Sequence, residues 1–95
     1  MADFNIVIGA NGDPSPTNLD CKAGDKITWT NNNTQSINSF TLPSCVSPNT
    51  SPAPLAPAAT SRQYTVTGAP NDYAYSYVLP SIESDTRGGT IDVGS

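Results

Sequence analysis

Histidine is absent from this 95-residue chain, and charged side chains are scarce. Without imidazole, neither a Ser-His-Asp arrangement nor a typical zinc site can be built. Charged residues make up 13% of the chain, about half the usual share. Turn-forming and hydroxyl-bearing residues replace them, which disfavours helices. The composition therefore indicates a small β-rich domain and excludes the commonest hydrolytic sites.

Basic residues and long apolar runs are also missing. Lys22, Lys26, Arg62 and Arg87 are the four basic residues, they are scattered, and the net charge is −4. A nucleic-acid backbone requires a dense basic patch, so no nucleic-acid partner is expected. No apolar run approaches the roughly 20 residues that cross a bilayer, so membrane insertion is not expected either.

Groups for catalysis and metal binding are few. Glu83 and Asp85 form a carboxylate pair of the kind that glycosidases use, but carboxylates in loops are usually solvated. The aspartates lack the Asp-x-Asp-x-Asp-Gly spacing of a calcium loop. We therefore expect no enzyme, no metal and no other cofactor. A hydrolase remains a less favoured alternative.

Two cysteines, Cys21 and Cys45, are too far apart in sequence for a Cys-x-x-Cys redox motif. They are either two unrelated buried thiols or one structural disulfide, and we favour the disulfide. A bridge closing this loop stabilises by roughly 3–4 kcal/mol on the chain-entropy model. It also implies an extracytoplasmic location, either secreted, periplasmic or on the cell surface. Met1 is then an addition to a mature domain; otherwise it is the initiator of a cytosolic protein.

Alternating apolar residues predict strands along most of the chain. The predicted strands cover residues 3–9, 17–21, 26–31, 36–42, 62–67, 73–79 and 88–93. Residues 11–16 are a predicted turn, and residues 43–60, which hold five prolines, are a predicted crossing between sheets. This pattern predicts one all-β domain over residues 1–95, a Greek-key β-sandwich of seven to eight strands.

The predicted core is aromatic and aliphatic, because the inward positions of these strands carry large side chains. Its members are Ile6, Ile8, Ile27, Trp29, Phe40, Leu42, Tyr64, Tyr73, Tyr75, Tyr77, Leu79, Ile91 and Val93.

Several segments together resemble the cupredoxins, such as plastocyanin and amicyanin. Residues 22–32 resemble the family's Ala-Gly-Asp turn and its following Trp-bearing strand. Residues 37–40, 54–58, 63–67, 73–77 and 89–93 resemble later family segments in the same order. The resemblance implies a cupredoxin-like sandwich. An unrelated immunoglobulin-like sandwich is the alternative.

The copper ligands of that family are two His, one Cys and usually a weakly bound axial Met. The first His position falls on Ser36 or Ile37, and the Cys position falls on Tyr77. The later ligand positions fall within residues 80–87, which contain neither His nor Met. The resemblance therefore implies a vestigial site, without the family's electron transfer. We expect Tyr77 to fill the space, with its hydroxyl bonded to Ser36 or to a backbone group.

The sequence thus predicts a copper-free, non-catalytic structural or binding module of a secreted or envelope protein. β-Sandwiches commonly carry recognition in their end loops. The candidate binding residues are Asn32, Asn33, Gln35, Ser81, Glu83 and Asp85, with the 43–60 connection as a further surface. The expected partner is a protein or a glycan. A self-assembling surface or appendage subunit is the alternative, and a metal-binding electron-transfer protein is less favoured.

Overall fold

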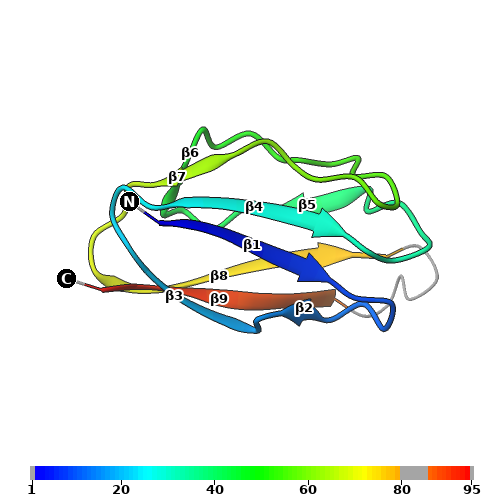
Figure 1. Cartoon of the computed structure of the whole chain (residues 1–95), viewed down its shortest axis with the longest axis horizontal. Helices are drawn as coiled ribbons and strands as arrows, with labels where there is room; N and C mark the ends of the chain where they lie inside the picture. Colours follow the sequence, from blue (N-terminus) through cyan, green and yellow to red (C-terminus); the bar gives the residue numbers. More distant parts are fainter. Residues whose placement is uncertain (1, 80–85, 95) are drawn as a thin grey trace.

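Two β-sheets pack face to face in the computed structural model, which describes residues 2–79 and 86–94 (Figure 1). The first sheet has the strand order β2 (Pro14–Ser15), β1 (Asp3–Ile8), β4 (Lys26–Asn31), β7 (Tyr64–Val66) and β6 (Val46–Ser47). The second has the order β3 (Asn18–Lys22), β9 (Thr86–Gly94), β8 (Asn71–Val78) and β5 (Ser39–Thr41). The predicted all-β sandwich is confirmed.

Parallel and antiparallel pairs coexist in both sheets. β1 runs parallel to β4, with Ile6 opposite Trp29, and β3 runs parallel to β9, with Cys21 opposite Val93. β8 is antiparallel to both β9 and β5. Because parallel neighbours need a long connection, each sheet joins segments that are distant in sequence. None of the described segments forms a helix of the length and apolarity that crossing a membrane requires.

Strand boundaries differ from the prediction where prolines interrupt the apolar alternation. β2 lies inside the predicted 11–16 turn and β6 inside the predicted 43–60 connection. Each of these two-residue strands is followed by a cis peptide bond to proline, at Pro16 and Pro48. β5 is shorter than predicted, because Ile37 forms only an isolated bridge with Leu55.

The core lies between the sheets and is centred on Trp29. The rings of Phe40, Tyr64 and Tyr75 each meet it edge-on, at centroid distances of 5.3–5.5 Å. Such pairs add to the free energy gained by burial alone. Of the predicted core residues, Leu42 and Tyr73 are only half-buried. The Tyr73 hydroxyl donates to the carbonyl of Ala69 near the surface. The buried hydrophobic residues absent from the predicted core are Leu19, Cys21, Ile37, Cys45, Val46, Leu55 and Val66.

The predicted disulfide was wrong: Cys21 and Cys45 are both free, buried thiols. Cys21 extends from β3 in the second sheet, whereas Cys45 precedes β6 in the first. A disulfide requires a specific approach of the two sulfurs and Cα atoms within about 7 Å of each other, and this pair of thiols is not bonded. The two thiols therefore belong to the core as small apolar groups. The prediction of an extracytoplasmic location loses the support that a disulfide would have given it.

Candidate functional site

Tyr77 occupies the position at which the cupredoxin resemblance places the cysteine ligand. It lies on β8 with its side chain between the sheets, 1% exposed, and its ring stacks on Phe40 with a centroid distance of 5.5 Å. The hydroxyl donates to the backbone carbonyl of Gly12 at 2.6 Å. The bond thus goes to a backbone group and not to Ser36. Burial raises the pKa of the Tyr77 phenol, so the hydroxyl stays protonated as a donor at neutral pH.

The upstream ligand position falls on Ser36 or Ile37, neither of which carries an imidazole. Ile37 is fully buried in the core and pairs with Leu55, with backbone hydrogen bonds in both directions at 2.8 and 2.9 Å. Ser36 is half-buried. Copper(II) sites of this kind need imidazole nitrogens and a thiolate. A hydrocarbon side chain and a phenol already bonded to a carbonyl do not fit such an ion. No group of three potential metal-ligating side chains occurs within residues 2–79 and 86–94.

The loop over residues 9–13 covers this end of the sandwich and is fixed from three other segments. Tyr77 binds its Gly12 carbonyl, and the Asn33 amide donates to the carbonyls of Gly9 and Ala10 at 3.2 and 3.0 Å. Arg87 forms an ion pair of 2.7 Å with Asp13. Because Arg87 lies opposite Tyr77 in the β8–β9 pair, one region of the second sheet holds the loop at two points.

The predicted binding residues of the 31–35 loop have different environments. The buried side chain of Asn31 donates to the carbonyls of Gln35 and Leu55 and accepts from the backbone N–H of Asn33. Asn33 is buried as well, and its side-chain oxygen accepts from the Gln35 N–H. Asn32 is exposed and Gln35 is half-buried. The asparagines therefore tie the loop to its surroundings, and a binding role for Asn32, Asn33 and Gln35 stays a prediction.

The remaining candidate surfaces are only partly described. Ser81, Glu83 and Asp85 lie outside the described residues. Within the 43–60 connection, the Thr50 carbonyl accepts from the Tyr64 hydroxyl at 2.6 Å, and the Ser51 hydroxyl donates to the Phe40 carbonyl at 2.9 Å. These bonds hold the connection against the core.

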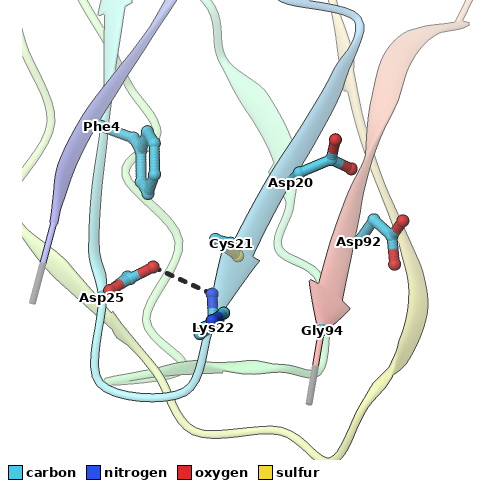
Figure 2. A pocket seen from close by; sticks show the side chains of 7 residues that line it. All are labelled: Phe4, Asp20, Cys21, Lys22, Asp25, Asp92 and Gly94. Carbon is cyan, nitrogen blue, oxygen red and sulfur yellow. Dashed lines mark hydrogen bonds between the residues drawn. The ribbon is translucent and has the colours of Figure 1, made fainter.

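A pocket that the strand pattern did not predict lies near the start of β1 and the end of β3 (Figure 2). Its volume is about 430 Å³, and it is lined by Phe4, Asp20, Cys21, Lys22, Asp25, Asp92 and Gly94. Figure 2 shows the Phe4 ring on β1 and the Cys21 thiol on β3, whereas the carboxylates of Asp20 and Asp92 extend on the other side of β3. Strand patterns do not show which edges face each other, so the sequence carried no signal for this pocket.

Asp25 lines the pocket, and both oxygens of its carboxylate are engaged in hydrogen bonds. They accept hydrogen bonds from the backbone N–H of Ala2 and of Lys22, each at 2.9 Å. These two bonds lower the pKa of Asp25. Burial raises the pKa of the Cys21 thiol to about 11, so Cys21 presents a neutral, weakly polar surface to the pocket at neutral pH.

No family model and no curated protein sequence matches this chain. Among solved structures, it resembles a purple cupredoxin from Nitrosopumilus maritimus with a TM-score of 0.65 and 23% identity, over 95% of this chain and 98% of that one. A reduced amicyanin variant matches with a TM-score of 0.65 and 19% identity, over 95% of this chain and 80% of the amicyanin. A pseudoazurin from Sinorhizobium meliltoi matches with a TM-score of 0.59 and 16% identity, over 100% of this chain and 76% of the pseudoazurin. The chain therefore has the cupredoxin fold, with Tyr77 buried where the resemblance places the cysteine ligand.

Proposed function

We propose that this chain is a copper-free cupredoxin-like module with a structural or binding role and no catalytic activity. The observation that carries the proposal is the state of Tyr77, which is buried, stacked on Phe40 and bonded to the Gly12 carbonyl. A well-packed aromatic side chain leaves little room for an ion, because protein interiors have few voids. The phenol has a structural task that a metal ligand cannot share.

The ordered end of the sandwich supports a binding role. Asn33, Tyr77 and Arg87 each hold the 9–13 loop in place through side-chain contacts. A surface ordered in advance binds with a smaller loss of conformational entropy than a mobile one. The hydrolase alternative depends on Glu83 and Asp85, which lie outside the described residues, and nothing else in the described chain favours it.

Copper titration tests the proposal. We expect purified protein to show neither a stoichiometric heat of Cu(II) binding nor a thiolate–copper absorption band. The variant in which Cys21 and Cys45 are both replaced by serine removes adventitious binding to the thiols and serves as the control. One-to-one copper binding that persists in this variant and disappears in Tyr77→Phe would contradict the proposal.

The extracytoplasmic location remains part of the proposal and needs its own test. Sequencing the gene upstream of the codon for Met1 shows whether a leader precedes the domain. We expect a secretory leader or an upstream extracellular domain, and a promoter directly before Met1 would count against this location.

A further inference from the structure

Two strand edges lie open on one side of the sandwich. β1 pairs with β4 along its whole length, but in the described part of the chain its other edge pairs with β2 at Val7 and Ile8 alone. The Lys26 N–H donates to the Ala2 carbonyl, and the Asn32 N–H donates to the Ile8 carbonyl. In a parallel ladder, alternate residues of a strand bond to the neighbouring strand. Since Ala2 and Ile8 bond to β4, the backbone groups of Asp3 and Asn5 are directed away from it. The first half of β1 therefore ends its sheet on this side.

β3 forms the second open edge, because it is the terminal strand of its sheet and, among the described residues, pairs with β9 alone. The Thr90 N–H donates to the Thr17 carbonyl, which directs the backbone groups of Asn18, Asp20 and Lys22 away from β9. Lys22 is already satisfied by Asp25, which accepts its N–H at 2.9 Å and donates to its carbonyl at 3.1 Å. The backbone of Asn18 and Asp20 has no other partner among the described residues, so the open stretch of β3 is short and ends at Lys22.

The pocket of Phe4 and Cys21 adjoins these two edges (Figure 2). Phe4 is half-buried on β1, and Cys21 lies on β3 next to Asp20. A strand added at the β3 edge directs alternate side chains toward the inner side of the sheet. One apolar side chain of such a strand reaches the pocket, while its backbone pairs with Asn18 and Asp20.

The charge around the edges selects the occupant. Asp3 lies on β1, and Asp20 lies on β3 opposite Asp92 of β9. The basic residue of the pocket lining is Lys22, so negative charge predominates around the two edges. Charged residues on an edge strand oppose its pairing with an identical strand. In a pair of copies of this chain, both edges would bring aspartates, whereas a basic segment brings opposite charges. The surface therefore favours a basic peptide over a second copy.

We propose that the β3 edge and the Phe4–Cys21 pocket form a docking surface for an extended, basic peptide segment of another protein, which joins the second sheet as an added strand. Main-chain hydrogen bonds to Asn18 and Asp20 provide affinity, and the pocket selects an apolar side chain flanked by Lys or Arg. This inference goes beyond the binding role proposed above, because the pocket lining includes no residue of the 9–13 loop. It is independent of the copper titration, so either can fail alone.

The probe is a synthetic capped hexapeptide of alternating lysine and valine, added to the ¹⁵N-labelled full chain. We expect the amide signals of Asn18 and Asp20 to shift and their hydrogen exchange to slow, because both N–H groups gain an acceptor. A capped hexapeptide of alternating glutamate and valine has the same β-propensity pattern with opposite charge. We expect it to produce neither effect.

Two variants and one control locate the interaction. Asp20→Pro removes the edge N–H without removing a β3–β9 hydrogen bond and should weaken binding about tenfold, as the loss of one good hydrogen bond predicts. Asp20→Lys should abolish it. Asp72→Lys makes the same charge change on the interior strand β8 and should retain most of the affinity. Each variant's amide spectrum reports whether it is folded.

Three results would overturn the proposal. The first is equal binding of the two peptides. The second is lysine-valine peptide binding without protection of the Asn18 and Asp20 amides. The third is concentration-dependent dimerisation of the free chain that Asp20→Lys changes, measured by sedimentation, because it would identify a second copy as the occupant of this edge.

Discussion

Two neighbouring tyrosines on β8 show how strongly one hydroxyl depends on its acceptor. Tyr77 donates to the Gly12 carbonyl, whereas the Tyr75 hydroxyl, which is also buried, has no hydrogen-bond partner within residues 2–79 and 86–94. Desolvation raises the pKa of Tyr75 to about 12, so this phenol stays neutral as well. Both rings stack on Phe40, so replacing either tyrosine by phenylalanine keeps the ring and tests the hydroxyl alone.

We predict that Tyr77→Phe lowers the free energy of unfolding by about 1–3 kcal/mol, because the buried Gly12 carbonyl loses its donor. Tyr75→Phe is the matched control. It deletes the same atom from the same strand without leaving an acceptor unpaired, and should change stability by less than about 0.5 kcal/mol. Urea denaturation measures both. Equal losses in the two variants would show that the Gly12 bond contributes nothing.

At the scale of elements, the outer face of the second sheet carries a row of carboxylates. Asp92 on β9 lies opposite Asp20 on β3 and opposite Asp72 on β8. The hydrogen bond with Asp72, followed by the charges of Asp72 and Asp20, raises the pKa of Asp92. The folded chain therefore retains this proton at a higher pH than the unfolded chain does. The resulting stability is present at low pH and is lost as the pH rises through the folded pKa.

We predict that Asp92→Asn makes the protein more stable at neutral pH, and that the advantage shrinks as the pH falls toward the ordinary Asp pKa of about 3.9. Urea denaturation over this pH range measures the difference. Asp3→Asn removes the same charge from a site outside the row and should give a smaller gain at neutral pH. A gain in stability of Asp92→Asn that did not change with pH would contradict a repulsion between Asp92 and its neighbouring carboxylates.

Asp25 should act in the opposite direction. Its pKa is lowered by the backbone N–H groups of Ala2 and Lys22, so its contribution to stability is present above the unfolded Asp pKa and is lost as the pH falls through the folded one. In Asp92→Asn, acid unfolding should therefore follow the protonation of Asp25 and similar carboxylates.

Regular strands were predictable, because their alternation records which side faces the core. Residues 26–31 match β4, and the alternating tyrosines of residues 73–79 correspond to most of β8. The two-residue strands β2 and β6 contain too few residues for any alternation, and prolines border both. Their pairing depends on what the rest of the fold brings alongside.

The site was only partly predictable, for reasons that differ between residues. The position of Tyr77 followed from one strong alternation, but its acceptor Gly12 is 65 residues away and has no sequence signal. The pattern 31–33 indicated a turn without showing that Asn31 and Asn33 point inward. Cys21 and Cys45 suggested a bridge by number alone, whereas the fold buries both as free thiols, and the sequence carries no signal for the distance between them.

For the whole molecule, the two free thiols report on global unfolding. Cys45 is fully buried, and Cys21 is nearly so beside the pocket. Burial raises the pKa of both thiols, so little reactive thiolate forms near neutral pH.

We predict that iodoacetamide labels neither thiol rapidly in the native protein, that Cys21 reacts before Cys45, and that both react at once in denaturant without reductant. Intact mass and peptide mapping measure this. The Cys21→Ser variant should lose the earlier native reaction and retain one site in denaturant. If the denatured protein gained mass only after a reductant was added, the result would contradict this prediction and support a Cys21–Cys45 disulfide.

The pairing of β3 with β9 has a consequence for how the protein is made. Asn18 and Thr90 share a side-chain hydrogen bond although 72 positions separate them. β9 also lies between β3 and β8. During synthesis, Leu19 and Cys21 therefore emerge long before the strand that shelters them. Until residue 94 has left the ribosome, the second sheet lacks β9, and a stalled or shortened nascent chain exposes an apolar surface that chaperones bind.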